Sequence, residues 1–241
     1  MVARTTSKID HPGTSEAEWQ SWLTARRFAP ANLTSCNSAV IVAAHPDDEV
    51  LGAGGTIAAL AAAGARIRIV AVTDGEASHP GTDSAALARR RADESTSALR
   101  ILGARAAEVI RLGIPDTKVA DAEAALAAQL QDLCAGFSVC LAPWEQDAHG
   151  DHEAAGRAAR RARADVLTFP IWMWHWASPG DPAVPWQRAV SVRLTDAVAT
   201  AKRAAISAFA SQLTPRSATV GPMLPSEVIA HFTRTQEVLF Q

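Results

Sequence analysis

The chain has 241 residues, enough for one α/β domain with a full core and fewer than two independent domains usually need. Its formal net charge of −2 and its charged fraction of 20% argue against a nucleic-acid partner, which would require a concentrated basic face. Its cysteines, Cys36, Cys134 and Cys140, form no CxxC pair, which excludes a disulfide framework and a thiolate zinc site.

Residues 1–35 form a polar extension that contains one expected helix. Ser15 and Glu18 have the spacing of a capping box, and Trp19 begins an apolar helical face. We expect this helix to dock on a single domain that occupies residues 36–241. The chain shows neither the apolar stretch of a signal peptide nor a transmembrane segment, so we expect a cytoplasmic location.

From residue 38 onward, expected strands alternate with expected helices. The run from Ala39 to Ala44 is continuously apolar, which is typical of a strand buried on both faces of a parallel sheet. The alternation predicts an α/β fold: a Rossmann-like three-layer sandwich with a mostly parallel sheet. The expected strands are 39–44, 66–72, 107–112, 138–142, 166–169 and 189–194, and the expected helices are 56–63, 84–102, 120–133, 152–164 and 196–211.

A cluster of polar residues follows the first strand directly: His45, Asp47, Asp48 and Glu49. The carboxyl ends of strands are where open parallel sheets bind their ligands. Three acids placed so close together repel one another, and a positive ion would relieve that repulsion. The alternative is a solvated loop whose acids only cap the following helix.

The glycine-rich run 52–55 raises the possibility of a nucleotide site, but two features oppose it. Ile57 occupies the third glycine position of the G-x-G-x-x-G motif. The preceding carboxylates also lie where a pyrophosphate would need a helix N-terminus free of negative charge. We interpret the glycines as residues that allow close packing.

A second cluster follows the fourth expected strand, between Glu145 and His152. In a doubly wound sheet both clusters would open on the same edge, so that His45, Asp48 and His152 can converge. Two imidazoles and one carboxylate suit catalytic zinc, which keeps a fourth position open for water. Ferrous iron also accepts this set, so Fe²⁺ remains possible beside Zn²⁺.

Together the two clusters resemble those of the PIG-L/LmbE-like deacetylases, a family that includes N-acetylglucosaminyl-phosphatidylinositol de-N-acetylase and the deacetylases of mycothiol and bacillithiol synthesis. The shared patterns are Ala-His-Pro-Asp-Asp-Glu after the first strand and His-x-Asp-His further on. The likeness spans roughly residues 38–240 and includes the run 73–76, Arg91-x-x-Glu94 and Trp144.

The resemblance implies a role for each residue of the two motifs. It makes the metal ligands His45, Asp48 and His152. It makes Asp47 the general base and His149 the group that assists the leaving amine, with Asp151 orienting His149. The implied enzyme is a zinc-dependent hydrolase that removes an N-acetyl group from an N-acetylglucosamine-type sugar conjugate, which would be its small-molecule partner.

Two alternatives stay open beside that activity: an amidase on a larger sugar-amide conjugate, and a non-catalytic module that binds metal or sugar. The expected substrate contacts are Arg91, Trp144 and His175. Three tryptophans would share one face if their segment were a strand, a face suited to a sugar ring or to core packing: Trp172, Trp174 and Trp176.

The last residues, 237–241, read Glu-Val-Leu-Phe-Gln. This run is compatible with an apolar strand, as in relatives of the family, and with the remnant of an expression tag cleaved by a picornaviral 3C-type protease. The sequence does not separate these interpretations, and it does not indicate the oligomeric state.

Overall fold

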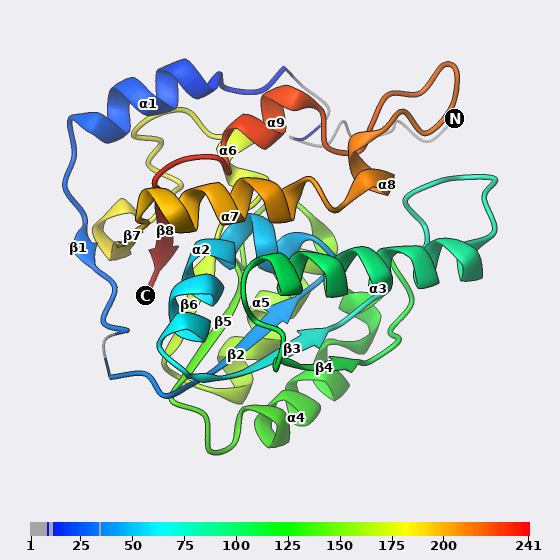
Figure 1. Ribbon diagram of the computed structural model, residues 1–241, viewed down its shortest axis with the longest axis horizontal. Helices are drawn as coiled ribbons and strands as arrows, with labels where there is room; N and C mark the ends of the chain where they lie inside the picture. The colour runs from blue at the N-terminus through cyan, green and yellow to red at the C-terminus, as the bar shows by residue number, and fades with distance from the viewer. Residues whose placement is uncertain (1–8, 10–11, 34) are drawn as a thin grey trace.

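The computed structural model describes residue 9 and residues 12–33 and 35–241 (Figure 1). The strands are β1 (Ala29–Pro30), β2 (Ser38–Ala43), β3 (Arg66–Ala71), β4 (Glu108–Arg111), β5 (Val139–Pro143), β6 (Val166–Phe169), β7 (Ala189–Arg193) and β8 (Gln236–Phe240). The α-helices are α1 (Glu16–Thr24), α2 (Asp48–Ala62), α3 (Ser84–Ile101), α4 (Glu123–Cys134), α5 (Gly150–Ala162), α6 (Met173–Trp176), α7 (Asp196–Ile206), α8 (Ala210–Leu213) and α9 (Ser226–Ala230). Short 3₁₀ helices are η2 (Val119–Ala122) and η3 (Trp186–Arg188).

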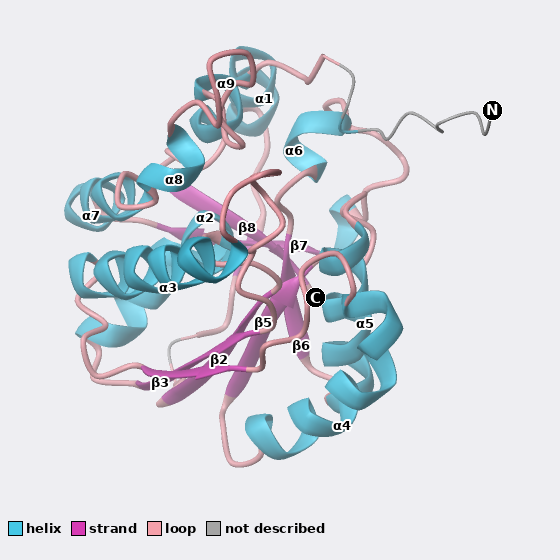
Figure 2. Ribbon diagram, turned by 90° about the vertical axis from the view of Figure 1, so that its right-hand side faces the viewer, coloured by secondary structure: helices cyan, strands magenta, loops and turns pink. Residues whose placement is uncertain are grey.

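These elements form three layers, which confirms the predicted sandwich (Figure 2). One open sheet has the strand order β1-β7-β8-β6-β5-β2-β3-β4, and its pairs are parallel except those that β8 makes with β6 and β7. Helices α2, α3 and α7 cover one face, and α4 and α5 cover the other. No described helix has the length and apolar character needed to span a bilayer.

The centre of the sheet decides where the site lies. Every residue of β2 is buried, as its continuously apolar sequence predicts for a strand covered on both faces. The chain runs from β2 outward through β3 to β4 and then returns to β5 on the other side of β2. The carboxyl ends of β2 and β5 are therefore neighbours at the topological switch point, where sheets of this kind bind ligands.

Helix α2 begins at Asp48, earlier than the predicted start at residue 56. Glycine is a poor helix former in isolation, but here packing requires it. A Cβ atom on Gly52 would lie 2.1 Å from the ring of Phe169, so only glycine lets the helix approach β6 this closely. The predicted role of the glycines in close packing is thus confirmed, whereas the boundary drawn from helix propensity was wrong.

Two other predictions about local structure need correction. The segment with three tryptophans forms the short helix α6 rather than a strand, so its indoles do not share one face. The helix expected over 196–211 stops at Ile206, because the chain turns there to bury Phe209 in the core, and α8 follows as a separate turn.

A buried ion pair replaces hydrogen bonds that α2 lacks. Ala53 has non-helical backbone angles, and these interrupt the regular ladder in which Gly55 N–H would donate to Leu51 O. Instead Lys202 Nζ donates to Leu51 O at 2.8 Å, and the amides of Gly55 and Thr56 donate to Glu237 at 2.6 and 2.9 Å. The two charges are 2.6 Å apart and buried.

Glu237 lies in the C-terminal run whose origin the sequence leaves open. In the fold this run is strand β8, inserted between β6 and β7, with Leu239 and Phe240 fully buried. The apolar-strand interpretation is confirmed as a description of its structure, and the segment is an integral part of the sheet.

The N-terminal helix docks on the same core. Its capping box between Ser15 and Glu18 is present as predicted, and Trp19 is fully buried and donates to the carbonyl of Trp174 at 2.7 Å. Glu16 accepts hydrogen bonds from Arg234 at 2.6 and 2.8 Å. The division into an extension (1–35) and a domain (36–241) remains a prediction, and residues 1–8, 10–11 and 34 of that extension lie outside the described part.

Substitution of Glu237 by glutamine should lower the free energy of unfolding by about 3–5 kcal/mol, because the buried ammonium of Lys202 then lacks a counter-charge. Chemical denaturation measures the loss. The double variant Lys202→Met/Glu237→Gln should be less destabilised than Glu237→Gln alone. Equal or greater destabilisation of the double variant would contradict the role of the ion pair.

The docking of α1 should weaken in acid. Burial alone would raise the pKa of Glu16, but the hydrogen bonds from Arg234 and His231 outweigh it and lower the pKa to about 2. The contact therefore stabilises the fold above pH 4.5, and this contribution disappears as the pH falls toward 2. Glu16→Gln should cost roughly 1–2 kcal/mol at pH 7 and much less at pH 3.

Urea unfolding at several pH values tests this expectation, with the exposed Glu227→Gln as the matched control. A deficit of Glu16→Gln that stays constant between pH 7 and pH 3 would show that the charge of Glu16 does not contribute.

Candidate active site

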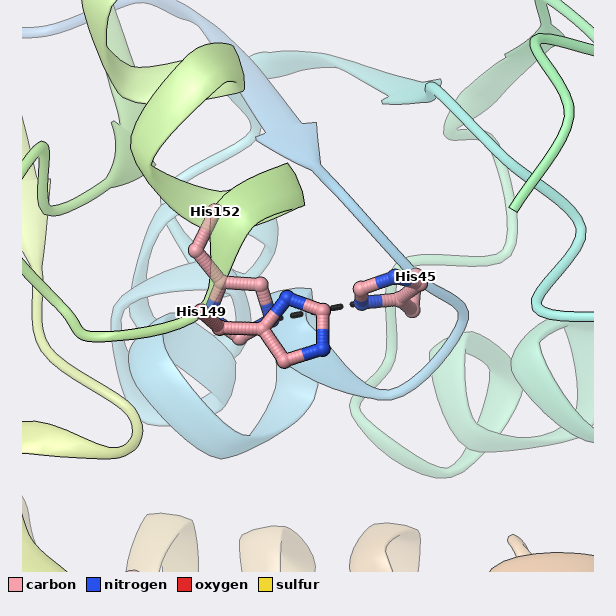
Figure 3. A group of neighbouring side chains, drawn as sticks. All are labelled: His45, His149 and His152. Carbon is pink, nitrogen blue, oxygen red and sulfur yellow. Dashed lines mark hydrogen bonds between the residues drawn. The ribbon is translucent and has the colours of Figure 1, made fainter. Parts of the chain in front are cut away.

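The two predicted clusters meet at the switch point of the sheet. His45, Asp47 and Asp48 lie between β2 and the first turn of α2, and His149 and His152 lie at the start of α5 after β5. The three imidazoles point toward one another (Figure 3). The predicted convergence of residues about a hundred positions apart is thus observed.

Three of these side chains present one donor atom each to a common point. His45 Nδ1 and His152 Nε2 are 3.2 Å apart, and Asp48 Oδ2 lies 3.5 Å from the first and 3.4 Å from the second. Donors bound tetrahedrally to zinc at its usual bond lengths are roughly 3.3 to 3.4 Å apart. The three atoms therefore have the spacing of three corners of a tetrahedral metal site.

The proton positions of both histidines agree with this arrangement. The other ring nitrogen of His45 donates to Asp151 at 3.1 Å and lies 3.2 Å from Asp116. The other nitrogen of His152 donates to Asp147 at 2.8 Å. These bonds hold the protons on the outer nitrogens and leave lone pairs on the two facing ones. Two lone pairs 3.2 Å apart repel unless a cation lies between them.

The electrostatics of the site also favour positive charge at this point. Burial lowers the pKa of each histidine, but the facing carboxylates outweigh it and raise the pKa of His45 and of His152. Burial likewise opposes ionisation of Asp48, yet the charge of His152 and the bonds from His45 hold the pKa of Asp48 well below its usual range.

Other potential ligands surround this set. His149 offers a ring nitrogen within reach of those of His45 and His152, and Asp116 and Asp151 approach the outer nitrogen of His45. The set His45, Asp48 and His152 fits a metal best, because the outer nitrogens of both histidines are already hydrogen-bonded to carboxylates and their inner nitrogens face Asp48 Oδ2.

Asp147 is a site residue that the sequence analysis missed. It is fully buried, and its carboxylate accepts the backbone amides of residues 171, 172 and 173 at 2.9–3.0 Å in addition to the proton of His152. Such a carboxylate fixes the tautomer and orientation of a metal-binding histidine. Its place inside the second acidic cluster was the available signal.

Asp151 does not orient His149, contrary to expectation. Its oxygens accept the amides of Thr117 and Val119 at 2.7 and 3.2 Å and the proton of His45. His149 Nδ1 is buried and has no hydrogen-bond partner among the described residues. Burial lowers the pKa of His149 to about 3, so this imidazole is neutral rather than held protonated.

Asp47 adopts strained backbone geometry beside the donor set, with a φ of 128°. Its amide donates to Glu49 at 3.1 Å, and its carboxylate accepts from Arg91 at 3.0 Å. Strain of this kind persists where several contacts hold a residue in place, as they do in many active sites. Burial raises the pKa of Asp47 to about 7 although the charge of Arg91 opposes the rise.

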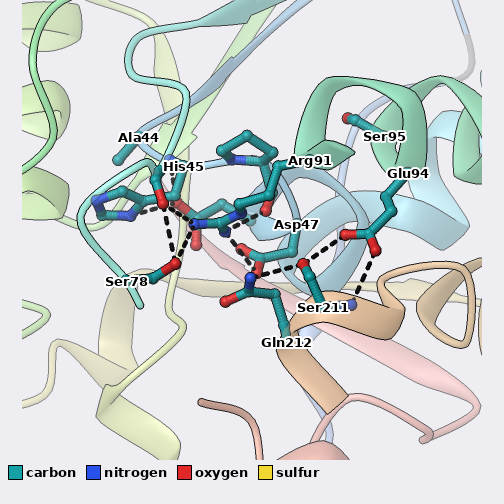
Figure 4. Close-up of polar contacts among 12 residues, drawn as sticks. Ala44, His45, Asp47, Ser78, Arg91, Glu94, Ser95, Ser211 and Gln212 are labelled. Atoms are coloured by element: carbon teal, nitrogen blue, oxygen red, sulfur yellow. Dashed lines mark hydrogen bonds and ion pairs between the residues drawn. The ribbon is translucent and has the colours of Figure 1, made fainter. Parts of the chain in front are cut away.

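Arg91 supports Asp47 rather than projecting into the cavity as a free cation. Its Nη2 also donates to the carbonyl of Pro46 at 2.6 Å, and its Nη1 donates to Gly75 at 2.8 Å (Figure 4). A Cβ on Gly75 would lie 1.8 Å from Nη1, which explains the glycine of the motif after β3. One turn later Glu94 accepts from the amide and hydroxyl of Ser211 at 2.8 and 2.6 Å.

A cavity of about 220 Å³ opens above these residues. The described lining includes the donor set, Asp47, Arg91, Asp116 and His149, together with Trp172, Gln212 and Arg216 from later in the chain. The cavity therefore places a reacting group against Asp47 and the donor set at once.

Two predicted substrate contacts do not reach this cavity. Trp144 is 2% exposed and stacks on Trp176 with ring centroids 6.4 Å apart, so it belongs to the core. His175 packs its ring against Gly13 and accepts the amide of Thr14 at its carbonyl, because α6 turns it toward the N-terminal segment. Of the tryptophans in this segment, Trp172 lines the cavity.

The chain matches the family described as PIG-L: GlcNAc-PI de-N-acetylase over residues 40–163, just over half of its length, and it belongs to this family. The matched range contains both clusters. A 1D-myo-inositol 2-acetamido-2-deoxy-alpha-D-glucopyranoside deacetylase from Mycobacterium avium is 49% identical over 73 residues, which are 27% of this chain and 24% of that protein. The match thus spans about a quarter of that curated relative.

Solved structures share the fold more broadly. A conserved protein from Thermus thermophilus is 30% identical with a TM-score of 0.56, over 74% of this chain and 80% of that one. The N,N'-diacetylchitobiose deacetylase from Pyrococcus horikoshii is 20% identical with a TM-score of 0.58, over 73% and 70%. The second likeness shows the fold alone.

Replacement of Asp147 by asparagine should weaken zinc binding by about 10–100-fold, because the histidine loses the carboxylate that fixes its tautomer. Competition with a chromophoric chelator measures the affinity, and circular dichroism checks the fold. Glu145→Gln is the matched control, since its carboxylate pairs with Arg160 at 2.9 Å instead of with a ligand. Equal zinc affinity of Asp147→Asn and the parent protein would contradict the assignment.

Proposed function

We propose that this protein is a zinc-dependent deacetylase that hydrolyses the N-acetyl group of an N-acetylglucosamine-type sugar conjugate. The observation that carries the proposal is the tetrahedral spacing of donor atoms on His45, Asp48 and His152 beside the carboxylate of Asp47, at one cavity. Membership of the PIG-L family supports the reaction class. The name of the M. avium relative supports an acetylated glucosamine as the substrate class.

The proposed metal ligands are His45, Asp48 and His152, and zinc bound to them would polarise the acetyl carbonyl and acidify water. Three protein ligands with an open position are typical of catalytic zinc. Ferrous iron suits the same donors, so metal analysis decides between the two.

Asp47 would act as the general base. It lies next to a proposed ligand without belonging to the donor set, and its pKa of about 7 suits a group that accepts a proton near neutral pH. Arg91 holds one carboxylate oxygen of Asp47 in place, and the backbone of Asp47 has a positive φ outside the helical range. The attacking water would lose its proton to this carboxylate.

His149 would assist departure of the amine. Its buried Nδ1 has no described partner, so the neutral imidazole would hydrogen-bond to the reacting amide, while the proton that Asp47 has taken would pass from Asp47 to the leaving nitrogen. This order of transfer replaces the expectation that His149 begins the reaction already protonated.

The test combines metal content with acetate release from a panel of N-acetylglucosaminides. We expect close to one zinc per chain and acetate release that a chelator abolishes. His152→Ala should lose both, whereas Asp47→Asn should keep the metal and lose at least about 10²-fold in kcat.

The outcomes separate the alternatives. Zinc without acetate release from any panel member would leave the amidase and the binding module as candidates, and release of a larger acid from a sugar amide would identify the amidase. A protein that binds no metal after reconstitution, or an Asp47→Asn variant with normal turnover, would contradict the proposed mechanism.

A further inference from the structure

Among the residues that the structure describes, the charged groups that line the cavity are paired, except for Arg216. Asp47 faces Arg91 at 3.0 Å, and Asp116 faces His45 at 3.2 Å. Asp48 faces both histidines of the donor set. Arg216 also lines the cavity, and it has no acidic partner among the described residues.

Backbone carbonyls hold the side chain of Arg216 in place. Its Nε donates to Gly221 O at 3.0 Å and its Nη1 donates to Ser78 O at 3.3 Å, so it links two walls of the cavity. Its Nη2 makes no hydrogen bond within the described chain and is not among its buried unpaired atoms. A positive charge with a free donor thus faces the cavity.

The loop that carries Arg216 is ordered by its own hydrogen bonds. The amide of Arg216 donates to Val220 O at 2.9 Å, and the hydroxyl of Ser217 accepts the amides of Thr219 and Val220 at 3.2 and 3.1 Å. Because the guanidinium is held before any ligand arrives, binding there costs little additional ordering.

A neutral histidine lies near Arg216. His79, whose ring contacts Ser78 and Ser211, is half-buried. Burial lowers the pKa of His79, and the nearby charges of Arg91 and Arg216 lower it further. His79 therefore leaves the charge of Arg216 uncompensated, and the nearby acids Asp47 and Asp116 already face Arg91 and His45.

We propose that Arg216 forms an anion subsite, and that the aglycone of the sugar conjugate carries a carboxylate or phosphate there. This inference rests on the proposed function, because it assigns the acetamido group to the donor set and the anionic group to Arg216 in the same cavity. Arginine binds both carboxylate and phosphate through paired N–H donors. The structure therefore favours a negatively charged group with two acceptor oxygens, which both anions provide.

Binding of deacetylated sugars, measured by titration calorimetry on the full chain, tests the subsite without requiring turnover. The probes are glucosamine 1-phosphate, glucosaminyl malate and the neutral methyl glucosaminide. We expect at least one anionic sugar to bind about tenfold or more tightly than the neutral one. Preference for the phosphate or for the carboxylate probe identifies the source of the anion.

Arg216→Gln should abolish the preference and leave the affinity for the methyl glycoside within about twofold, since a surface loop residue contributes little to the fold. Arg203→Gln is the matched control: it removes the same charge from an exposed position on α7 and should keep the preference. Arg216→Lys should retain part of the preference for anionic sugars, because the positive charge remains while the paired N–H donors of the planar guanidinium are lost.

Equal binding of all three sugars, absence of binding by both anionic ones, or a preference that survives Arg216→Gln would overturn the inference. Acetate release from the corresponding N-acetylated sugars is recorded in parallel. An anionic preference without acetate release would refute the proposed function and support the anion subsite. Acetate release without an anionic preference would support the proposed function and refute the subsite.

Discussion

The architecture of the site follows from one electrostatic constraint: several carboxylates are buried together at the edge of the sheet. A buried carboxylate is costly unless a cation or several donors compensate it. Asp147 has three backbone amides and a histidine, Asp151 has two amides and a histidine, and Asp47 has Arg91. Asp48 and the inner nitrogens of the two histidines face one another at the remaining point, where a metal ion would complete the compensation.

The same constraint explains why residues from distant parts of the chain contact the site and the helix that carries it. Arg91 reaches Asp47 from α3, and Glu94 on the same helix holds Ser211, which precedes the cavity residue Gln212 (Figure 4). The C-terminal strand supports the middle of α2, just after the irregular residue Ala53, through Glu237. Helix α2, whose first turn carries Asp48, is therefore held just before its start and at its middle by residues from other elements.

Much of the site was predictable because it depends on local sequence at strand ends. The first cluster follows a continuously apolar run, the second follows another strand, and parallel strands of an open sheet end at one edge. The details of pairing were not predictable. Asp151 neighbours His149 in sequence but contacts His45, and Trp144 precedes the second cluster but lies in the core. Arg216 carries no local motif and reaches the cavity only through its loop.

The sequence by itself determined the alternation of strands and helices, the two clusters and the choice of donors, since hydrophobic period and residue chemistry are local properties. Tertiary structure decided the rest. The strand order places β5 beside β2, and this determines which ring nitrogens of His45 and His152 face which carboxylates of the two clusters. Close packing against neighbouring elements requires glycines inside α2. The terminal run 237–241, whose structure the sequence leaves open, provides most of strand β8 in the sheet, from which Glu237 supports α2. These outcomes depend on contacts between residues far apart in the chain, which no local pattern encodes.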